Sequence, residues 1–221
     1  WQEEDDDHIF DRDVQYTLMK DFETMMAYML TTPVLDQDTV HQLSMQQMQL
    51  VVQKIKTELN NLELSDTQQQ AYRLMLLALC CEAIYRTTGY FPRDIQIICV
   101  LNTLRRTEHM INEVQTGEGK SMITAMLGVV GSLDQTVDFA TENEQLVRDG
   151  LHAFQPLYLY LGIACGGEMI QAKSPKEAYV EHGINASTPA DFSFFRVFKA
   201  LRHEDLPKKT LLLCDEIHVA L

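Results

Sequence analysis

Hydrophobic and polar positions follow two patterns along this chain, and the change comes near residue 90. In the first part, apolar residues recur every three to four positions, which places them on one face of an α-helix. Three helices are predicted, with apolar faces made by Val14, Leu18, Phe22, Met25 and Met29, then by Met45, Met48, Val52, Ile55 and Leu59, then by Leu74, Leu77, Ala78, Cys81, Ile84 and Tyr85. Residues 14–88 are therefore expected to form an α-helical N-terminal region, preceded by a flexible acidic tail over residues 1–13.

Local signals mark the ends of these helices. Ser65 is a candidate N-cap, and Gln68 three residues later completes a capping box. Thr31-Thr32-Pro33 ends the first helix, Asn60-Asn61 the second and Thr88-Gly89 the third. The methionine-rich stripes indicate ordinary core, with a pliable binding groove as the alternative.

From Phe91 onward, predicted helices alternate with short apolar runs. Helices are expected from residue 91, with Pro92 at the start, and over residues 144–160 and 192–201; strands are expected over residues 110–114, 136–141, 161–166, 183–186 and 210–216. The run Thr210–Cys214 is continuously apolar, as in a central strand covered by helices on both faces. The alternation predicts an α/β fold with a parallel doubly wound sheet over residues 89–221.

A glycine turn, Gly117-Glu118-Gly119-Lys120-Ser121, separates one predicted strand from the helix that begins at Met122. Glycines let backbone N–H groups approach phosphate oxygens, and a helix N-terminus adds partial positive charge. Lys120 is expected to reach the terminal phosphates and the Ser121 hydroxyl to help hold Mg²⁺. The stricter phosphate-loop pattern has glycine at the place of Val114, so a helicase-type loop fits better; a chance turn is the alternative.

Two carboxylates, Asp215 and Glu216, end the last apolar run. Nucleotide hydrolysis needs Mg²⁺ opposite the phosphate loop and a residue that orients water, and acids at the end of a neighbouring strand supply both. Asp215 is expected to hold the metal through water, and Glu216 to act as general base. A surface acid pair is the alternative, but the loop upstream predicts the same chemistry independently.

Gln96 is a candidate for reading the base of a nucleotide. Its amide can donate and accept hydrogen bonds at once, so it can pair with both an acceptor and a donor on the edge of adenine. Phe91 and Arg93 are near enough in sequence to pack on the base. From these residues alone, a solvent-facing helix position is the simpler interpretation of Gln96.

The net charge and the cysteine content limit which classes of function fit this chain. The formal net charge is −14, and the longest basic cluster is Lys208-Lys209, which opposes nucleic-acid binding. Five cysteines in apolar contexts, with Cys80 and Cys81 adjacent, indicate reduced thiols rather than a zinc site. No apolar run is long enough to span a membrane and no signal peptide is visible, so a cytoplasmic location is expected. The chain begins with Trp1, and we expect it to be part of a longer protein.

Four blocks, in order, resemble the first nucleotide-binding domain of the SecA family, the motor ATPases of bacterial preprotein translocation. The blocks are residues 91–96, residues 113–121 with the characteristic Thr116-Gly117-Glu118-Gly119-Lys120, residues 140–162 and residues 215–218. The resemblance covers roughly two-thirds of the chain, from about Leu74, and the helices before it show no clear match.

The resemblance implies a RecA-like phosphate-loop domain that binds ATP with Mg²⁺. It assigns Phe91, Arg93, Gln96, Thr116, Gly117, Glu118, Gly119, Lys120 and Ser121 to the nucleotide, Ser121 and Asp215 to the metal, and Lys120 and Glu216 to catalysis. It also implies that ATP is closed between two such domains, so a chain with only the first should bind weakly and hydrolyse slowly.

Three departures from the family pattern bear on function. Ser121 stands where threonine is usual, which keeps the hydroxyl, and His218 stands where aspartate is usual, which gives a DExH motif as in nucleic-acid helicases. The block at residues 185–192 lacks most of the glycines and asparagines that help couple nucleotide state to substrate.

The predicted function is an ATP-driven, SecA-like motor that translocates or remodels a polypeptide, with contact to a translocon or to the membrane surface as a peripheral protein. Two alternatives remain open. One is a diverged SecA-like module kept for protein interaction, with weak or no ATPase activity. The other is a DExH nucleic-acid helicase, which His218 favours and the charge of −14 opposes.

Overall fold

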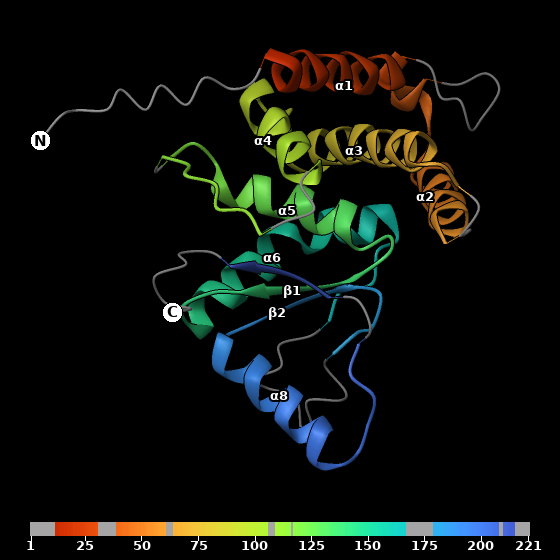
Figure 1. The fold of residues 1–221 in the computed structure, drawn as a ribbon. Helices are drawn as coiled ribbons and strands as arrows, with labels where there is room; N and C mark the ends of the chain where they lie inside the picture. Colours follow the sequence, from red (N-terminus) through yellow and green to blue (C-terminus); the bar gives the residue numbers. More distant parts are fainter. Residues whose placement is uncertain are drawn as a thin grey trace, which may run out of the picture.

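The structure is a computed structural model that describes residues 12–30, 39–60, 64–105, 109–115, 117–166, 179–207 and 210–214. Helices dominate the first half, and a small parallel sheet follows in the second (Figure 1). In chain order the elements are α1 (Arg12–Leu30), the 3-10 turn η1 (Val40–Gln42), α2 (Met45–Leu59), α3 (Asp66–Thr88), α4 (Asp94–Leu104), α5 (Lys120–Gly131), β1 (Thr136–Ala140), α6 (Glu144–Leu161), β2 (Ile184–Ser187), α8 (Pro189–Leu201) and β3 (Thr210–Cys214).

Helix α3 lies at the centre of the helical part. Every residue from Leu74 to Ile84 is buried, and the helix packs against α1, α2, α5 and α6. A helix that is apolar all round can be stable only when neighbours cover it on all sides. Its ends follow the predicted signals, because the Ser65 side chain accepts from the backbone of Gln68 and Gly89 ends the helix with φ 79°.

One hydrophobic core joins the helices to the sheet. It runs from Leu18 and Met25 of α1 through α3 and α5 to Val137 of β1 and Ile184 of β2. The division predicted at residue 88 stays a prediction, and the packing across it is continuous.

The described strands form a parallel sheet in the order β2-β1-β3. In the register of this sheet, Val137 stands opposite Ile184 on one side and opposite Leu211 on the other. Side chains in register on neighbouring strands share a face, so these three form part of the surface that α5 covers. A Cβ added to Gly128 would lie 2.9 Å from the Phe139 ring, so glycine allows this helix to lie close to the sheet.

Helix α8 packs against β1 on the opposite face of the sheet (Figure 1). Its Phe192 and Phe195 pack on Ala140, and the Phe195 ring stacks on Tyr179 with the ring centroids 4.2 Å apart. Asp138 lies on this same face and accepts a 3.1 Å hydrogen bond from Arg196 of α8. The helix is therefore attached to the sheet by a small apolar cluster, this ion pair and a hydrogen bond that the Ser187 hydroxyl of β2 donates to the Asp191 carboxylate.

Replacing Asp138 by asparagine is expected to change how stability depends on pH. Burial raises the pKa of the Asp138 carboxyl above its ordinary 3.8, although hydrogen bonds from Tyr179 and Arg196 oppose this rise. The folded chain thus keeps a proton on Asp138 at pH values where the unfolded chain has released it. This carboxyl stabilises the fold below about pH 4, and the contribution is lost as the pH rises through the folded-state pKa.

Asparagine does not titrate, so this loss is absent from the variant. Urea unfolding at a series of pH values from about 4 to 7 should show Asp138→Asn gaining stability relative to the parent as the pH rises. A relative stability that falls with rising pH would contradict the assignment.

Three predictions about strands were wrong or too long. Residues 110–114 form no strand, because Ile111, Asn112 and Glu113 are exposed and no described strand pairs with them. The expected strand over residues 161–166 is reduced to one bridge between Cys165 and Ile184.

The third correction concerns β3, which lies at the edge of the described sheet, while β1 is central. Leu211 and Leu213 pack against the core, but Leu212 is 54% exposed because no described helix covers β3 on that side. The two helix starts also shift. Pro92 precedes the N-cap Arg93 of α4 instead of opening the helix, and α8 begins at Pro189, three residues before the expected start.

Candidate functional site

The loop before α5 is built around two glycines. Gly117 has φ 88° and Gly119 has φ 81°, in the left-handed region that other residues rarely adopt. Between them, the N–H of Glu118 donates to the carbonyl of Gln115 at 3.1 Å, which closes a turn. Gly119 is the N-cap of α5, so the chain passes directly from this turn into the helix.

Lys120 and Ser121 are the first two residues of α5. The amides of a first helical turn have no carbonyl partner within the helix, and the helix dipole makes this end positive. None of the ion pairs among the described residues involves Lys120, and Ser121 is exposed. Backbone amides, an ammonium group and a hydroxyl are therefore available together at one helix end, a combination that suits a phosphate ligand.

This helix end lies at the side of the molecule toward which β1 and β3 point (Figure 1). The carboxyl ends of parallel strands form the edge where open α/β sheets bind ligands. Asp215 and Glu216 directly follow β3 in the sequence, but they lie outside the described residues, as does Thr116. The roles predicted for these three residues stay predictions.

Gln96 of α4 supports the loop through its side-chain amide. Its side-chain nitrogen donates to the carbonyl of Glu118 at 2.8 Å, and its side-chain oxygen accepts from the backbone N–H of Arg93 at 2.9 Å. Gln96 is buried, and its amide lies so close to Gly119 that a Cβ there would collide with it. The sequence pattern placed Gln96 in the candidate site but did not indicate this support of the loop. The three-residue spacing of Arg93 and Gln96, which is that of a capping box, could have indicated only the hydrogen bond from the Arg93 N–H to Gln96 at the start of α4.

Arg93 makes a second link to the loop. Its guanidinium lies 2.9 Å from the Glu118 carboxylate, with both side chains about half exposed. Phe91 is partly exposed nearby in the sequence, and the neighbouring Tyr90 and Ile95 are more exposed. The start of α4 thus contributes a cation, an amide and exposed apolar side chains beside the loop.

Alanine at Gly119 is expected to disturb this arrangement more than alanine at Gly117. Both positions have positive φ, which costs an alanine roughly 1 to 2 kcal/mol. Only at Gly119 does the added Cβ also meet the Gln96 amide, whereas at Gly117 it meets nothing within 4 Å.

Urea unfolding of Gly119→Ala and Gly117→Ala checks this difference, with Gly117→Ala as the matched control for backbone strain. The Gly119 variant should be less stable than the Gly117 variant. Equal stabilities, or a less stable Gly117 variant, would show that the Gln96 contact does not constrain the loop.

No group of three or more His, Cys, Asp or Glu side chains among the described residues is arranged to hold a metal ion. No helix in the described part of the chain combines the length and apolarity needed to cross a bilayer.

Comparison with known proteins decides the family. The model of the SecA DEAD-like domain matches residues 12–202. The chain belongs to the SecA family. The match makes the fold an α/β RecA-like domain of the SecA type, and it begins at residue 12. It therefore includes the N-terminal helices, which sequence motifs alone did not connect with SecA.

Individual SecA proteins are similar at moderate identity. The chain is 27% identical to protein translocase subunit SecA 2 of Staphylococcus epidermidis over 169 residues, which cover 72% of this chain and 20% of that protein. It is 31% identical to protein translocase subunit SecA of Symbiobacterium thermophilum over 137 residues, which cover 58% of this chain and 14% of that protein. It is also 31% identical to protein translocase subunit SecA of Syntrophobacter fumaroxidans over 150 residues, which cover 63% of this chain and 17% of that protein. The chain thus spans about a fifth or less of the length of these relatives.

Proposed function

We propose that the loop Gly117–Ser121 binds the triphosphate of ATP and that this chain is the first nucleotide-binding domain of a SecA-like ATPase. The observation that carries the proposal is the positive end of α5, where two left-handed glycines precede Lys120 and Ser121. Glycines at these positions leave room for phosphate oxygens against backbone N–H groups. The match to the SecA DEAD-like domain supports a nucleotide as the ligand, and we propose that it is ATP.

Each residue has a defined role in this proposal. Lys120 binds the terminal phosphates, while the hydroxyl of Ser121 and the carboxylate of Asp215 hold Mg²⁺, which neutralises charge on the phosphate oxygens. An oxygen donor set of this kind suits Mg²⁺. Glu216 accepts a proton from the attacking water. Thr116 and Glu118 complete the loop.

The start of α4 binds the base. Gln96 retains one N–H and one oxygen lone pair beyond its bonds to Glu118 and Arg93, which is enough to donate to adenine and accept from it. Phe91 and Arg93 pack on the purine ring. Because Gln96 also supports the loop, recognition of the base is linked to the position of the phosphates.

In the full-length protein we propose that ATP hydrolysis drives translocation or remodelling of a polypeptide. The relatives are named protein translocase subunits, which supports a polypeptide as the partner. A second candidate is a protein-interaction module with weak ATPase activity. The exposed apolar face of α8 favours that candidate.

ATPase assays of the full-length protein test the function. A motor of this kind should hydrolyse ATP faster when an unfolded polypeptide is added, and it should not respond to single-stranded nucleic acid. Glu216→Gln, which keeps the size of the side chain, should bind ATP and lose hydrolysis. Stimulation by nucleic acid alone would establish a helicase instead, and ATP binding without hydrolysis in the parent would establish the interaction module.

A further inference from the structure

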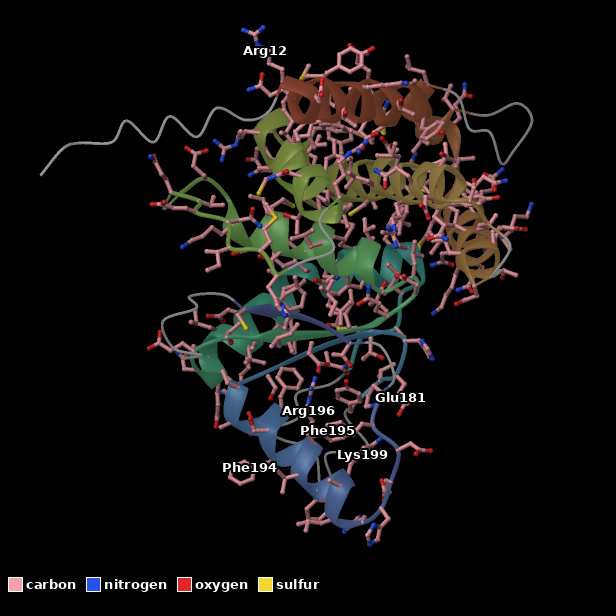
Figure 2. All side chains as sticks on the ribbon, viewed as in Figure 1. Arg12, Glu181, Phe194, Phe195, Arg196 and Lys199 are labelled. Atoms are coloured by element: carbon pink, nitrogen blue, oxygen red, sulfur yellow. The ribbon has the colours of Figure 1, made fainter. Side chains whose placement is uncertain are left out.

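Helix α8 turns its most apolar stripe away from the sheet. The stripe is formed by Phe194 (73% exposed), Val197 (55%), Phe198 (46%) and Leu201 (74%), which share one side of the helix by their spacing. Only Phe192 and Phe195 of this helix are buried. Figure 2 shows Phe194 on the side of α8 opposite Phe195, Arg196 and Lys199. We call these four exposed residues the α8 stripe.

Polar contacts fix this orientation of the helix. Arg196 pairs with the buried Asp138, and Lys199 lies 3.1 Å from the carboxylate of Glu181. At the first turn, the Asp191 carboxylate accepts from the hydroxyls of Ser187 and Thr188. A rotation that buried the α8 stripe would break these contacts, so its exposure is a property of the folded domain.

One cation borders the α8 stripe. The guanidinium carbon of Arg202 lies 4.1 Å from the centroid of the Phe198 ring. An arginine stacked on an aromatic ring keeps its N–H groups free at the edge, in the geometry that binds a carboxylate with two hydrogen bonds. A positive group on an apolar stripe is distinctive on a chain of net charge −14.

We propose that the α8 stripe and Arg202 bind an amphipathic helix of another polypeptide whose apolar residues are flanked by carboxylates. Apolar residues spaced three, four and seven apart form the ridges that pack against a second helix. The uncovered Leu212 of β3 lies on the same face of the sheet as Asp138, because the two are in register. The α8 stripe and Arg202 are separate from the loop before α5, so the proposal does not depend on nucleotide binding.

Two other occupants fit less well. A second copy would present the same α8 stripe and the same Arg202 in a two-fold contact, and none of the four stripe residues is a carboxylate that could pair with that arginine. Binding to anionic membranes uses clusters of four to eight or so basic residues. On α8, Arg196 and Lys199 are already paired with acids of this chain.

Fluorescence anisotropy with two synthetic peptides tests the proposal. Each peptide is about 18 residues long, roughly five helical turns, with leucines at helical spacing. One carries glutamates beside the leucines, and its matched control carries lysines in their place. The acidic peptide should bind saturably, and the lysine peptide should bind much more weakly.

Variants locate the binding surface. Phe194→Ser combined with Leu201→Ser should weaken binding of the acidic peptide about tenfold or more. Arg202→Glu should weaken binding of the acidic peptide and strengthen binding of the lysine peptide. Tyr16→Ser removes an equally exposed aromatic from α1 and should change nothing. Circular dichroism melts confirm that each variant is folded.

Three outcomes would overturn the proposal. In the first, both peptides bind equally, or binding survives loss of Phe194 and Leu201. In the second, sedimentation shows dimers that the double serine variant abolishes, which would make a second copy the occupant. In the third, the parent binds phosphatidylserine vesicles through the α8 stripe and ignores the peptides, which would make it a membrane-binding surface.

Discussion

Replacing Lys120 by alanine is expected to weaken the binding of ATP by roughly 10- to 150-fold, because a charge-assisted contact to phosphate is worth roughly 1.5 to 3 kcal/mol. Lys120 is the first residue of α5, directly after the left-handed Gly119. Its ammonium is the cation that faces the terminal phosphates in the proposed site. Titration of the chain with a fluorescent ATP analogue, with and without Mg²⁺, measures the effect.

The control for this variant is Lys54→Ala, which removes the same charge from an exposed position of α2. It should bind the analogue like the parent, since long-range loss of one positive charge on an acidic chain is screened by salt. If Lys120→Ala bound the analogue as well as Lys54→Ala, the loop would not be the phosphate site.

Replacing Arg86 by alanine is expected to lower the free energy of unfolding by about 3 to 5 kcal/mol, because it leaves a buried carboxylate without its main partner. Arg86 of α3 lies 2.6 Å from Glu82, whose side chain is 4% exposed. It also donates to the carbonyls of Val40, His41 and Leu43 around η1.

The same guanidinium donates to the hydroxyl of Tyr160 on α6 at 3.0 Å. Arg86 therefore joins α3 to η1 and to α6, and its loss leaves several acceptors unsatisfied at once. Urea unfolding measures the change, with Lys20→Ala on the exposed side of α1 as the control. The control should change stability by less than about 0.5 kcal/mol. A similarly small effect at Arg86 would show that this network does not hold the helices together.

Features set by neighbours in the sequence were predictable. The Ser65 capping box and the left-handed Gly89 bracket α3 as expected, because both are made within one helical turn. The start of a helix after the glycine turn was also predicted, with a shift of two residues from Met122 to Lys120.

Features set by distant parts of the chain were not predictable. The apolar residues of β3 indicated a central strand, but whether a strand is central depends on which strands pair beside it. Leu212 is exposed because of that pairing and not because of its own neighbours. The same reason explains residues 110–114, whose composition suits a strand that finds no partner among the described strands.

The contacts of Gln96 show the same limit within the candidate site. The spacing of Arg93 and Gln96 was visible in the sequence, and so was the loop. The hydrogen bond from Gln96 to Glu118 joins residues 22 apart and exists only because α4 packs beside α5. Sequence alone therefore suggested a base-reading glutamine and could not reveal that it also supports the loop before α5.

The most direct test of the central claim is the amide spectrum of the ¹⁵N-labelled chain during titration with ATP and Mg²⁺. If the loop binds the triphosphate, the largest shifts will come from the backbone amides of Gly117, Gly119, Lys120 and Ser121, with a further shift at the side-chain amide of Gln96. Shifts confined to other parts of the chain, or none at millimolar nucleotide, would contradict the account and leave α5 as a structural helix of a SecA-type fold.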